Sequence, residues 1–144
     1  MTRVEKTVLV LYSAERMYGL IVDVPNYPHF LPWCSAAEVH ERHGDDMRAT
    51  LHIHFHGLRQ HFTTHNTGTP FESVVMELEQ GPFQHLRGEF RLVARGAEAC
   101  RIEFSLEWRF SGFLLEKMVG PVFQTMANTM VDAFVKRADD LYGG

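Results

Sequence analysis

The clearest pattern in the chain is a strict alternation of apolar and polar residues over residues 101–110. The apolar set of this stretch is Ile102, Phe104, Leu106, Trp108 and Phe110. Successive side chains of a β-strand point to opposite faces of its sheet. The alternation therefore predicts a strand of an antiparallel sheet that has one buried face and one wet face.

Further stretches with the composition of strands are separated by turn residues. They cover residues 3–11, 37–42, 47–56, 58–66, 74–79 and 86–94. The segment HGDD at residues 43–46 predicts a hairpin between the second and third of these stretches. Gly57, Gly81 and Gly96 mark later turns, so the sequence predicts a long run of antiparallel strands.

Apolar residues at helical spacing predict two helices. Ser13 is suited to cap the first, and prolines from Pro25 onward end it and hold residues 25–33 in an irregular path. The second helix occupies residues 113–141, and we expect Gly120 and Pro121 to break or kink it. At ~1.5 Å per residue, the part that begins at Pro121 would be about 30 Å long.

This order of elements predicts an α+β fold in a single domain over residues 1–144. A sheet with one wet face has to cover the other. The C-terminal helix is the only predicted element large enough to do so. A curved sheet that grips one helix leaves a gap, and such gaps form apolar ligand pockets.

The composition excludes several classes of protein. Hydrophobic residues make up 45% of the 144 residues and charged residues 22%, which excludes a disordered chain. No apolar run reaches the ~18 residues of a spanning helix, and the N-terminus lacks the form of a signal peptide. Cys34 and Cys100 lack a CxxC partner, which indicates free thiols and a cytoplasmic location. The net charge of −4 gives no electrostatic footprint for nucleic acid, neither DNA nor tightly bound RNA.

An ordered set of segments carries a family resemblance. The segments are SAERMYGLIVDV from Ser13, YPHFLPWC from Tyr27, LRQHFTTHN from Leu58, GPFQHLRGEFRL from Gly81, GPVF from Gly120 and AFVKRADDLYG from Ala133. Together they resemble the coenzyme Q-binding and ribosome association toxin family of START-like domains, which are polyketide cyclase/dehydrase-type (SRPBCC) domains. The resemblance implies a helix-grip (START/Bet v1-like) fold, in which a curved antiparallel sheet wraps around a long C-terminal helix.

The resemblance also implies two functions. The first is non-enzymatic binding of ubiquinone or a related isoprenoid lipid, in support of respiratory electron transport, with no cofactor beyond that ligand. The alternative is a toxin-like regulator that binds the large ribosomal subunit and blocks subunit association. Some relatives with this fold are cyclases or dehydratases, which leaves an enzyme as a further alternative.

The family's cavity is lined from the sheet interior and from the inner face of the last helix. Carried onto this chain, the candidate ligand-binding residues are Phe30, Leu31, Trp33, Phe55, Phe62, Phe90, Phe104, Leu106, Trp108, Phe123, Met126, Met130 and Phe134. Such a lining suits an isoprenoid tail, which gains ~25 cal/mol per Å² of apolar area buried. The same residues are also typical of ordinary core packing, so each has two interpretations.

Arg137 lies near the apolar stripe of the last helix and is a further ligand-binding candidate. An inward guanidinium could donate to a quinone carbonyl, or pair with Glu89 or Glu103, and a surface position is the simpler interpretation. A cyclase would need an acid–base pair inside the cavity, for which Tyr27, His29 and Arg137 are the only candidates. We therefore predict no catalytic residues.

Histidines recur at a spacing of two, at His52, His54 and His56. A His-x-His pair can ligate zinc, but a site needs a third ligand. Because the alternate residues Leu51, Ile53 and Phe55 are apolar, the row is expected on the wet face, and no metal site is predicted.

The stretch from Phe110 to Met118 combines apolar side chains with Lys117. It would suit transient contact with a membrane surface, at its inner face, while lipid is loaded. Alternatively, it is a capping helix over the edge of the sheet.

Overall fold

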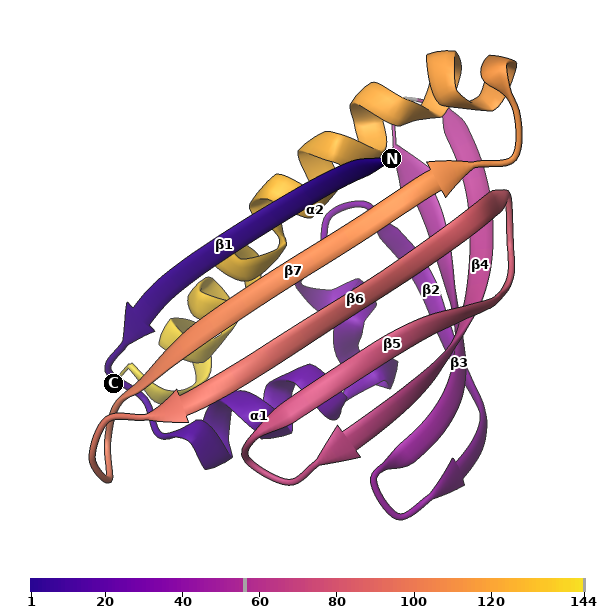
Figure 1. The fold of residues 1–144 in the computed structure, drawn as a ribbon. Helices are drawn as coiled ribbons and strands as arrows, with labels where there is room; N and C mark the ends of the chain where they lie inside the picture. The colour runs from indigo at the N-terminus through magenta and orange to yellow at the C-terminus, as the bar shows by residue number, and fades with distance from the viewer. Residues whose placement is uncertain (56, 144) are drawn as a thin grey trace.

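The chain folds into one antiparallel sheet with its helices on one side, in a computed structural model that describes residues 1–55 and 57–143 (Figure 1). The strands are β1 (Thr2–Val10), β2 (Cys34–His43), β3 (Asp46–Phe55), β4 (Leu58–Thr69), β5 (Ser73–Gln80), β6 (Phe83–Ala94) and β7 (Cys100–Phe110). The helices are α1 (Ala14–Val22), the 3₁₀ helix η1 (Val24–His29) and α2 (Phe113–Tyr142). The predicted α+β class is confirmed.

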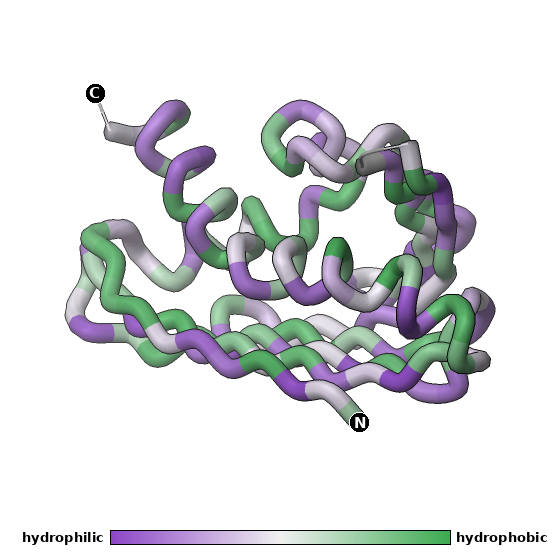
Figure 2. The backbone as a smooth tube through the Cα atoms, turned by 90° about the horizontal axis from the view of Figure 1, so that it is seen from above, coloured by the Kyte–Doolittle hydropathy of each residue, from purple (hydrophilic) through white to green (hydrophobic). Residues whose placement is uncertain are grey.

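The seven strands are ordered β1-β7-β6-β5-β4-β3-β2. From β2 to β7 each strand pairs with the next along the chain, and β1 pairs with β7, with Val4 opposite Leu106. The predicted hairpin between β2 and β3 is present, with His43 opposite Asp46. Figure 2 shows the sheet as one layer with the helices over one of its faces. This arrangement explains the alternation of apolar and polar residues in β7. The apolar residues of β7 are buried beneath the helices, and the residues between them are largely half-exposed.

Helix α2 covers the inner face of the sheet. Its buried residues recur at intervals of three and four, at Val119, Gly120, Phe123, Met126, Ala127, Val131, Phe134 and Ala138. Of the two expected outcomes at Gly120 and Pro121, the break is absent, since α2 runs without interruption through both residues, and the kink stays a prediction. Pro121 lacks a backbone N–H and so removes one helical hydrogen bond. The burial of Val119 and Phe123 on either side holds both turns against the sheet.

The N-terminal helices close one end of this interface. The Ser13 hydroxyl caps α1 by accepting from the Arg16 N–H at 3.1 Å, as its sequence position predicts. The proline-rich segment after α1 begins as the 3₁₀ helix η1, which buries Tyr27, and the predicted irregular path is found only over residues 30–33. Helix α1 packs against α2, β5 and β6. The sheet is therefore covered along its length by α2 and at one end by α1 and η1.

A close approach at Gly68 fastens α1 to the β2–β3 turn. The Tyr18 hydroxyl of α1 donates to Asp45 Oδ1 at 2.8 Å, and the Gly68 N–H donates to the Asp45 carbonyl oxygen at 3.1 Å. A Cβ atom at Gly68 would overlap the Tyr18 hydroxyl and lie 2.8 Å from the Asp45 carbonyl oxygen. The absence of a side chain at this position lets the three segments meet.

This contact predicts opposite effects of one substitution at two glycines. Gly68→Ala should lower the free energy of unfolding by about 1–3 kcal/mol, because backbone atoms of Asp45 cannot move aside cheaply. Gly19→Ala, in open space within α1, should instead raise it by up to about 1 kcal/mol. Urea denaturation followed by circular dichroism measures both, and equal effects of the two substitutions would contradict this account.

Candidate functional site

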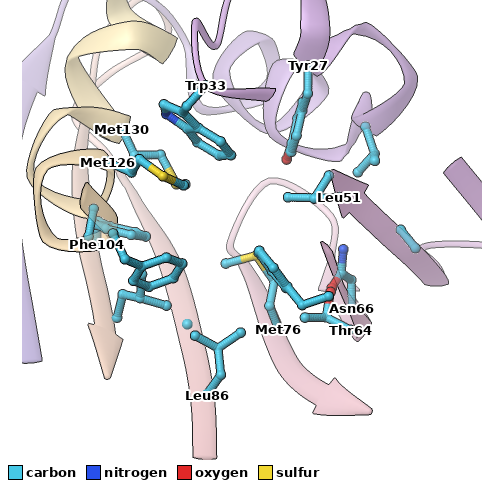
Figure 3. A pocket seen from close by; sticks show the side chains of 17 residues that line it. Tyr27, Trp33, Leu51, Thr64, Asn66, Met76, Leu86, Phe104, Met126 and Met130 are labelled. Carbon is cyan, nitrogen blue, oxygen red and sulfur yellow. The ribbon is translucent and has the colours of Figure 1, made fainter. Parts of the chain in front are cut away.

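An apolar cavity lies between the inner face of the sheet and α2 (Figure 3). Its cavity volume is about 50 Å³, and about 620 Å³ of atom-free space is reached when its mouth and the adjoining open solvent are included. Its wall is formed by Val24, Tyr27, Trp33, Ala49, Leu51, Phe62, Thr64, Asn66, Met76, Leu86, Gly88, Phe104, Leu106, Phe123, Met126, Ala127 and Met130. Of these, only Leu51, Met76 and Met130 are half-buried, and the rest are buried.

Two groups of aromatic rings flank the middle of α2. The Phe134 cluster consists of Tyr27, Phe30, Phe90, Phe104 and Phe134, with neighbouring ring centroids 4.7–5.9 Å apart. The Phe123 cluster consists of Phe62, Phe83, Trp108, Phe110 and Phe123, with centroids 4.8–6.3 Å apart. At ~1.5 Å per residue, Phe123 and Phe134 are about 16 Å apart along the helix. The rings fill the space at these two positions.

Between the two clusters the wall is made of small and flexible side chains. Ala49, Gly88 and Ala127 leave space, and Met76, Met126 and Met130 border it. A Cβ atom at Gly88 would lie 2.8 Å from Met76 Cε and 3.1 Å from Leu106 Cδ1, so the missing side chain helps to keep the cavity open. Methionine side chains adapt readily to an irregular guest.

Few polar groups reach the cavity. Thr64 and Asn66 lie on β4, and the Thr64 hydroxyl donates to Asn66 Oδ1 at 2.7 Å. The Tyr27 hydroxyl donates to the Ile21 carbonyl oxygen, and burial raises the pKa of this phenol. Tyr27 therefore stays neutral and already hydrogen-bonded at physiological pH.

Seven of the predicted ligand-binding residues line the cavity. They are Trp33, Phe62, Phe104, Leu106, Phe123, Met126 and Met130. The others lie beside it: Leu31, Phe90, Trp108 and Phe134 are buried in the surrounding core, and Phe30 is half-buried. The side chain of Phe55 lies outside the described part of the structure.

Sequence reasoning missed the residues that give the cavity its space and its polarity. The sequence pattern does not single out Ala49, Gly88 and Ala127, because a small residue at an inward-facing position is typical of ordinary core packing and does not predict a cavity. Thr64 and Asn66 could have been found, since they follow Phe62 at the two-residue spacing of one strand face.

The polar residues considered for catalysis do not meet in the cavity. His29 is exposed, and the guanidinium of half-buried Arg137 lies over the Phe30 ring at 5.4 Å rather than on the cavity wall. Burial raises the pKa of the Cys34 thiol to about 11, so this thiol is protonated at neutral pH and a poor nucleophile. Within the described residues, no acid–base pair faces the cavity.

The predicted histidine row lies on the outer face of the sheet. The His52 and His61 rings stack with centroids 5.5 Å apart, and His52 Nε2 is 3.4 Å from Glu38 Oε2. His54 is exposed, and His56 falls outside the described residues. Across the residues that are described, His, Cys, Asp and Glu side chains form no group of three suited to a metal ion.

The stretch proposed for membrane contact forms the exposed first turns of α2. The side chains of Phe113, Leu114 and Met118 are 80%, 68% and 54% exposed, so they do not cover the sheet edge. Among the described residues, no helix has the length and apolar character needed to cross a bilayer.

The cavity predicts a specific effect of filling it. Gly88→Leu should place a side chain in the empty space and weaken the binding of a neutral apolar fluorescent dye at least tenfold. Gln84→Leu adds the same side chain to an exposed position of the same strand and should leave dye affinity unchanged. A fluorescence titration compares the variants, and equal affinities would show that the dye binds elsewhere.

Comparison with known proteins identifies related sequences. Residues 10–135 match the family model described as polyketide cyclase / dehydrase and lipid transport. The ribosome association toxin RatA of Pseudomonas aeruginosa is 44% identical over 99% of both chains, and RatA of Escherichia coli is 41% identical over 99% of this chain and 90% of that protein. The mitochondrial coenzyme Q-binding protein COQ10 homolog B of Xenopus laevis is 27% identical over 92% of this chain and 56% of that protein.

Solved structures share the fold. The Zhui aromatase/cyclase from Streptomyces sp. R1128 superposes with a TM-score of 0.84 at 19% identity, covering 96% of this chain and 93% of that one. A START superfamily protein from Mycobacterium smegmatis gives 0.74 at 23% identity, covering 96% and 98%. These likenesses confirm the predicted helix-grip fold.

Proposed function

The chain belongs to the polyketide cyclase / dehydrase and lipid transport family, and from this premise we propose that it associates with the large ribosomal subunit and blocks subunit joining. The observation that carries the proposal is the similarity to ribosome association toxins, which extends over nearly the whole of both chains. The family resemblance of the sequence predicted ubiquinone binding as the main function and the ribosomal role as the alternative. The comparisons favour the ribosomal alternative, because the coenzyme Q-binding relative is less similar and only partly covered.

The surface charges limit how the ribosome could be recognised. The net charge is −4, and several arginines are already paired with carboxylates. Examples are Arg48 with Glu79 at 2.5 Å and Arg101 with Glu103 at 2.9 Å. A protein that neutralises few phosphates releases few counterions, so its affinity for RNA depends weakly on salt. We therefore expect the protein to recognise the ribosome by its shape and by individual chemical groups rather than by net charge.

This proposal predicts a change in the sedimentation of ribosomes. Excess protein added to purified 30S and 50S subunits of Pseudomonas aeruginosa should reduce the 70S peak of a sucrose gradient and migrate with the 50S peak. Its co-sedimentation should weaken much less than the ~10³-fold or more expected of a basic RNA-binding protein between about 50 and 200 mM salt.

An unrelated acidic protein of similar mass is the control for crowding and non-specific effects. An undiminished 70S peak, with the protein left at the top of the gradient, would contradict the proposal. A strong loss of ribosome binding with increasing salt would instead contradict the proposal that the contact does not depend on net charge.

The cavity supports a second function, the binding of an apolar small molecule such as ubiquinone or a related isoprenoid. The side chains that line the cavity are almost all apolar, so burying apolar ligand surface there gains ~25 cal/mol per Å². We propose that this binding is non-enzymatic, because the described residues place no acid–base pair against the ligand. A role in respiration would follow if the ligand is a quinone.

Both proposals place the protein in the cytoplasm. For the second, the exposed apolar side chains at the start of α2, together with Lys117, would contact the inner membrane surface while ligand is loaded.

The second function predicts that ligand accompanies the purified protein. Mass spectrometry of an organic extract should detect an isoprenoid quinone or similar lipid with the unmodified chain, and strongly reduced amounts with Gly88→Leu. The exposed-position variant Gln84→Leu should retain it. Equal lipid in all three preparations would show that the lipid does not occupy the cavity.

A further inference from the structure

The polar side of the cavity is built by one strand. Alternation along β4 turns Phe62, Thr64 and Asn66 toward the interior, while Thr63 lies on the outer face. Asn66 is paired with Met47 of β3 and Met76 of β5, in the middle of the sheet. Its side chain is only 7% exposed and lines the cavity (Figure 3).

The hydrogen bonds of Asn66 are incomplete. Its Oδ1 accepts from the Thr64 hydroxyl at 2.7 Å, which fixes the orientation of the amide. The amide nitrogen carries two N–H donors, and neither has an acceptor among the described residues. Figure 3 shows this nitrogen on the side of Asn66 toward Leu51, with the oxygen toward Thr64. A donor that lines the cavity and has no acceptor in the protein is available to a guest that supplies one.

Other polar groups near the cavity are bonded elsewhere or lie off its wall. Within the described residues, Trp108 Nε1 is buried without a hydrogen-bond partner, but Trp108 does not line the cavity. The Tyr27 hydroxyl is bonded to the Ile21 carbonyl oxygen. The guanidinium of Arg137, which the sequence analysis offered as a donor to a carbonyl, lies over Phe30 away from the cavity wall. Among the described residues, the Asn66 amide and the Trp33 indole N–H are the side-chain donors on the cavity wall that have no hydrogen bond in the protein, and the amide is the one that a neighbouring side chain holds in place.

We propose that the cavity binds an apolar molecule that carries a carbonyl oxygen, and that this oxygen accepts a hydrogen bond from Asn66 Nδ2. This inference rests on the second proposed function, the binding of an apolar ligand. It adds the residue that recognises the oxygen of the ligand. Thr64 is a positioning residue, because its hydroxyl holds the amide oxygen and so turns the nitrogen toward the guest.

The contribution of the Asn66 donor can be measured by comparing the binding affinities of two probes of similar shape. Menadione has a bicyclic ring with two carbonyl groups, and methylnaphthalene is the corresponding hydrocarbon. Asn66→Leu keeps the side-chain volume but removes both donors. It should weaken menadione about tenfold, as loss of one hydrogen bond implies, while methylnaphthalene binds as well as before or better.

Two further variants separate a specific role from general damage to the fold. Thr64→Val frees the amide to turn and should weaken menadione by a smaller factor than Asn66→Leu. Thr63→Val removes a buried hydroxyl from the outer face of the same strand, where it contacts Thr50 Oγ1 at 2.6 Å, and should change neither probe's affinity. In the unmodified chain, menadione should shift the side-chain amide NMR signals of Asn66, and methylnaphthalene should not.

The outcomes distinguish the two levels of the proposal. If both probes bind the unmodified chain and Asn66→Leu weakens both equally, or neither, the role of Asn66 is overturned while ligand binding stands. If neither probe binds the unmodified chain at any accessible concentration, the ligand-binding function fails and this inference fails with it.

Discussion

The structure depends on the burial of one face of a seven-stranded sheet by a single long helix. The sheet turns an apolar row from each strand inward, and a helix only about 10 Å wide covers it. Coverage by one helix cannot match a broad concave surface everywhere. The chain resolves this mismatch differently along α2, with bulky rings near both ends of the interface and small residues at its middle.

The contrast between these zones accounts for the stability of the interface and for the position of the proposed binding site. Around Phe123 and Phe134, aromatic rings meet edge to face, an arrangement that contributes beyond the area it buries. Between them, Gly88 and Ala127 leave volume that no neighbouring side chain fills. A cavity inside a close-packed interior forgoes packing energy, so its retention is better explained by a guest than by folding.

Much of the fold could be predicted from the sequence, because alternation and helical spacing report directly on burial. The strict alternation of β7 and the HGDD hairpin are both confirmed. The uninterrupted α2 was not predicted, because the local preference of Pro121 yields to burial on both sides of it. The candidate site was predicted in part: inward-facing residues were identified, but only register and helix placement decide that Phe104 reaches the cavity while Phe90 packs behind it. The space itself is set by Gly88, which no hydrophobic pattern reveals.

The central structural claim is that a ligand occupies the middle of the interface between sheet and helix, and the methionines provide internal reporters for it. Met76, Met126 and Met130 line the cavity, whereas Met118 is exposed on the first turns of α2. The most direct measurement is the methyl NMR spectrum of the methionines during a titration with menadione. The account predicts shifts and ligand contacts at the three cavity methyl groups, with Met118 unchanged. Shifts confined to Met118, with the cavity methyl groups undisturbed, would contradict it.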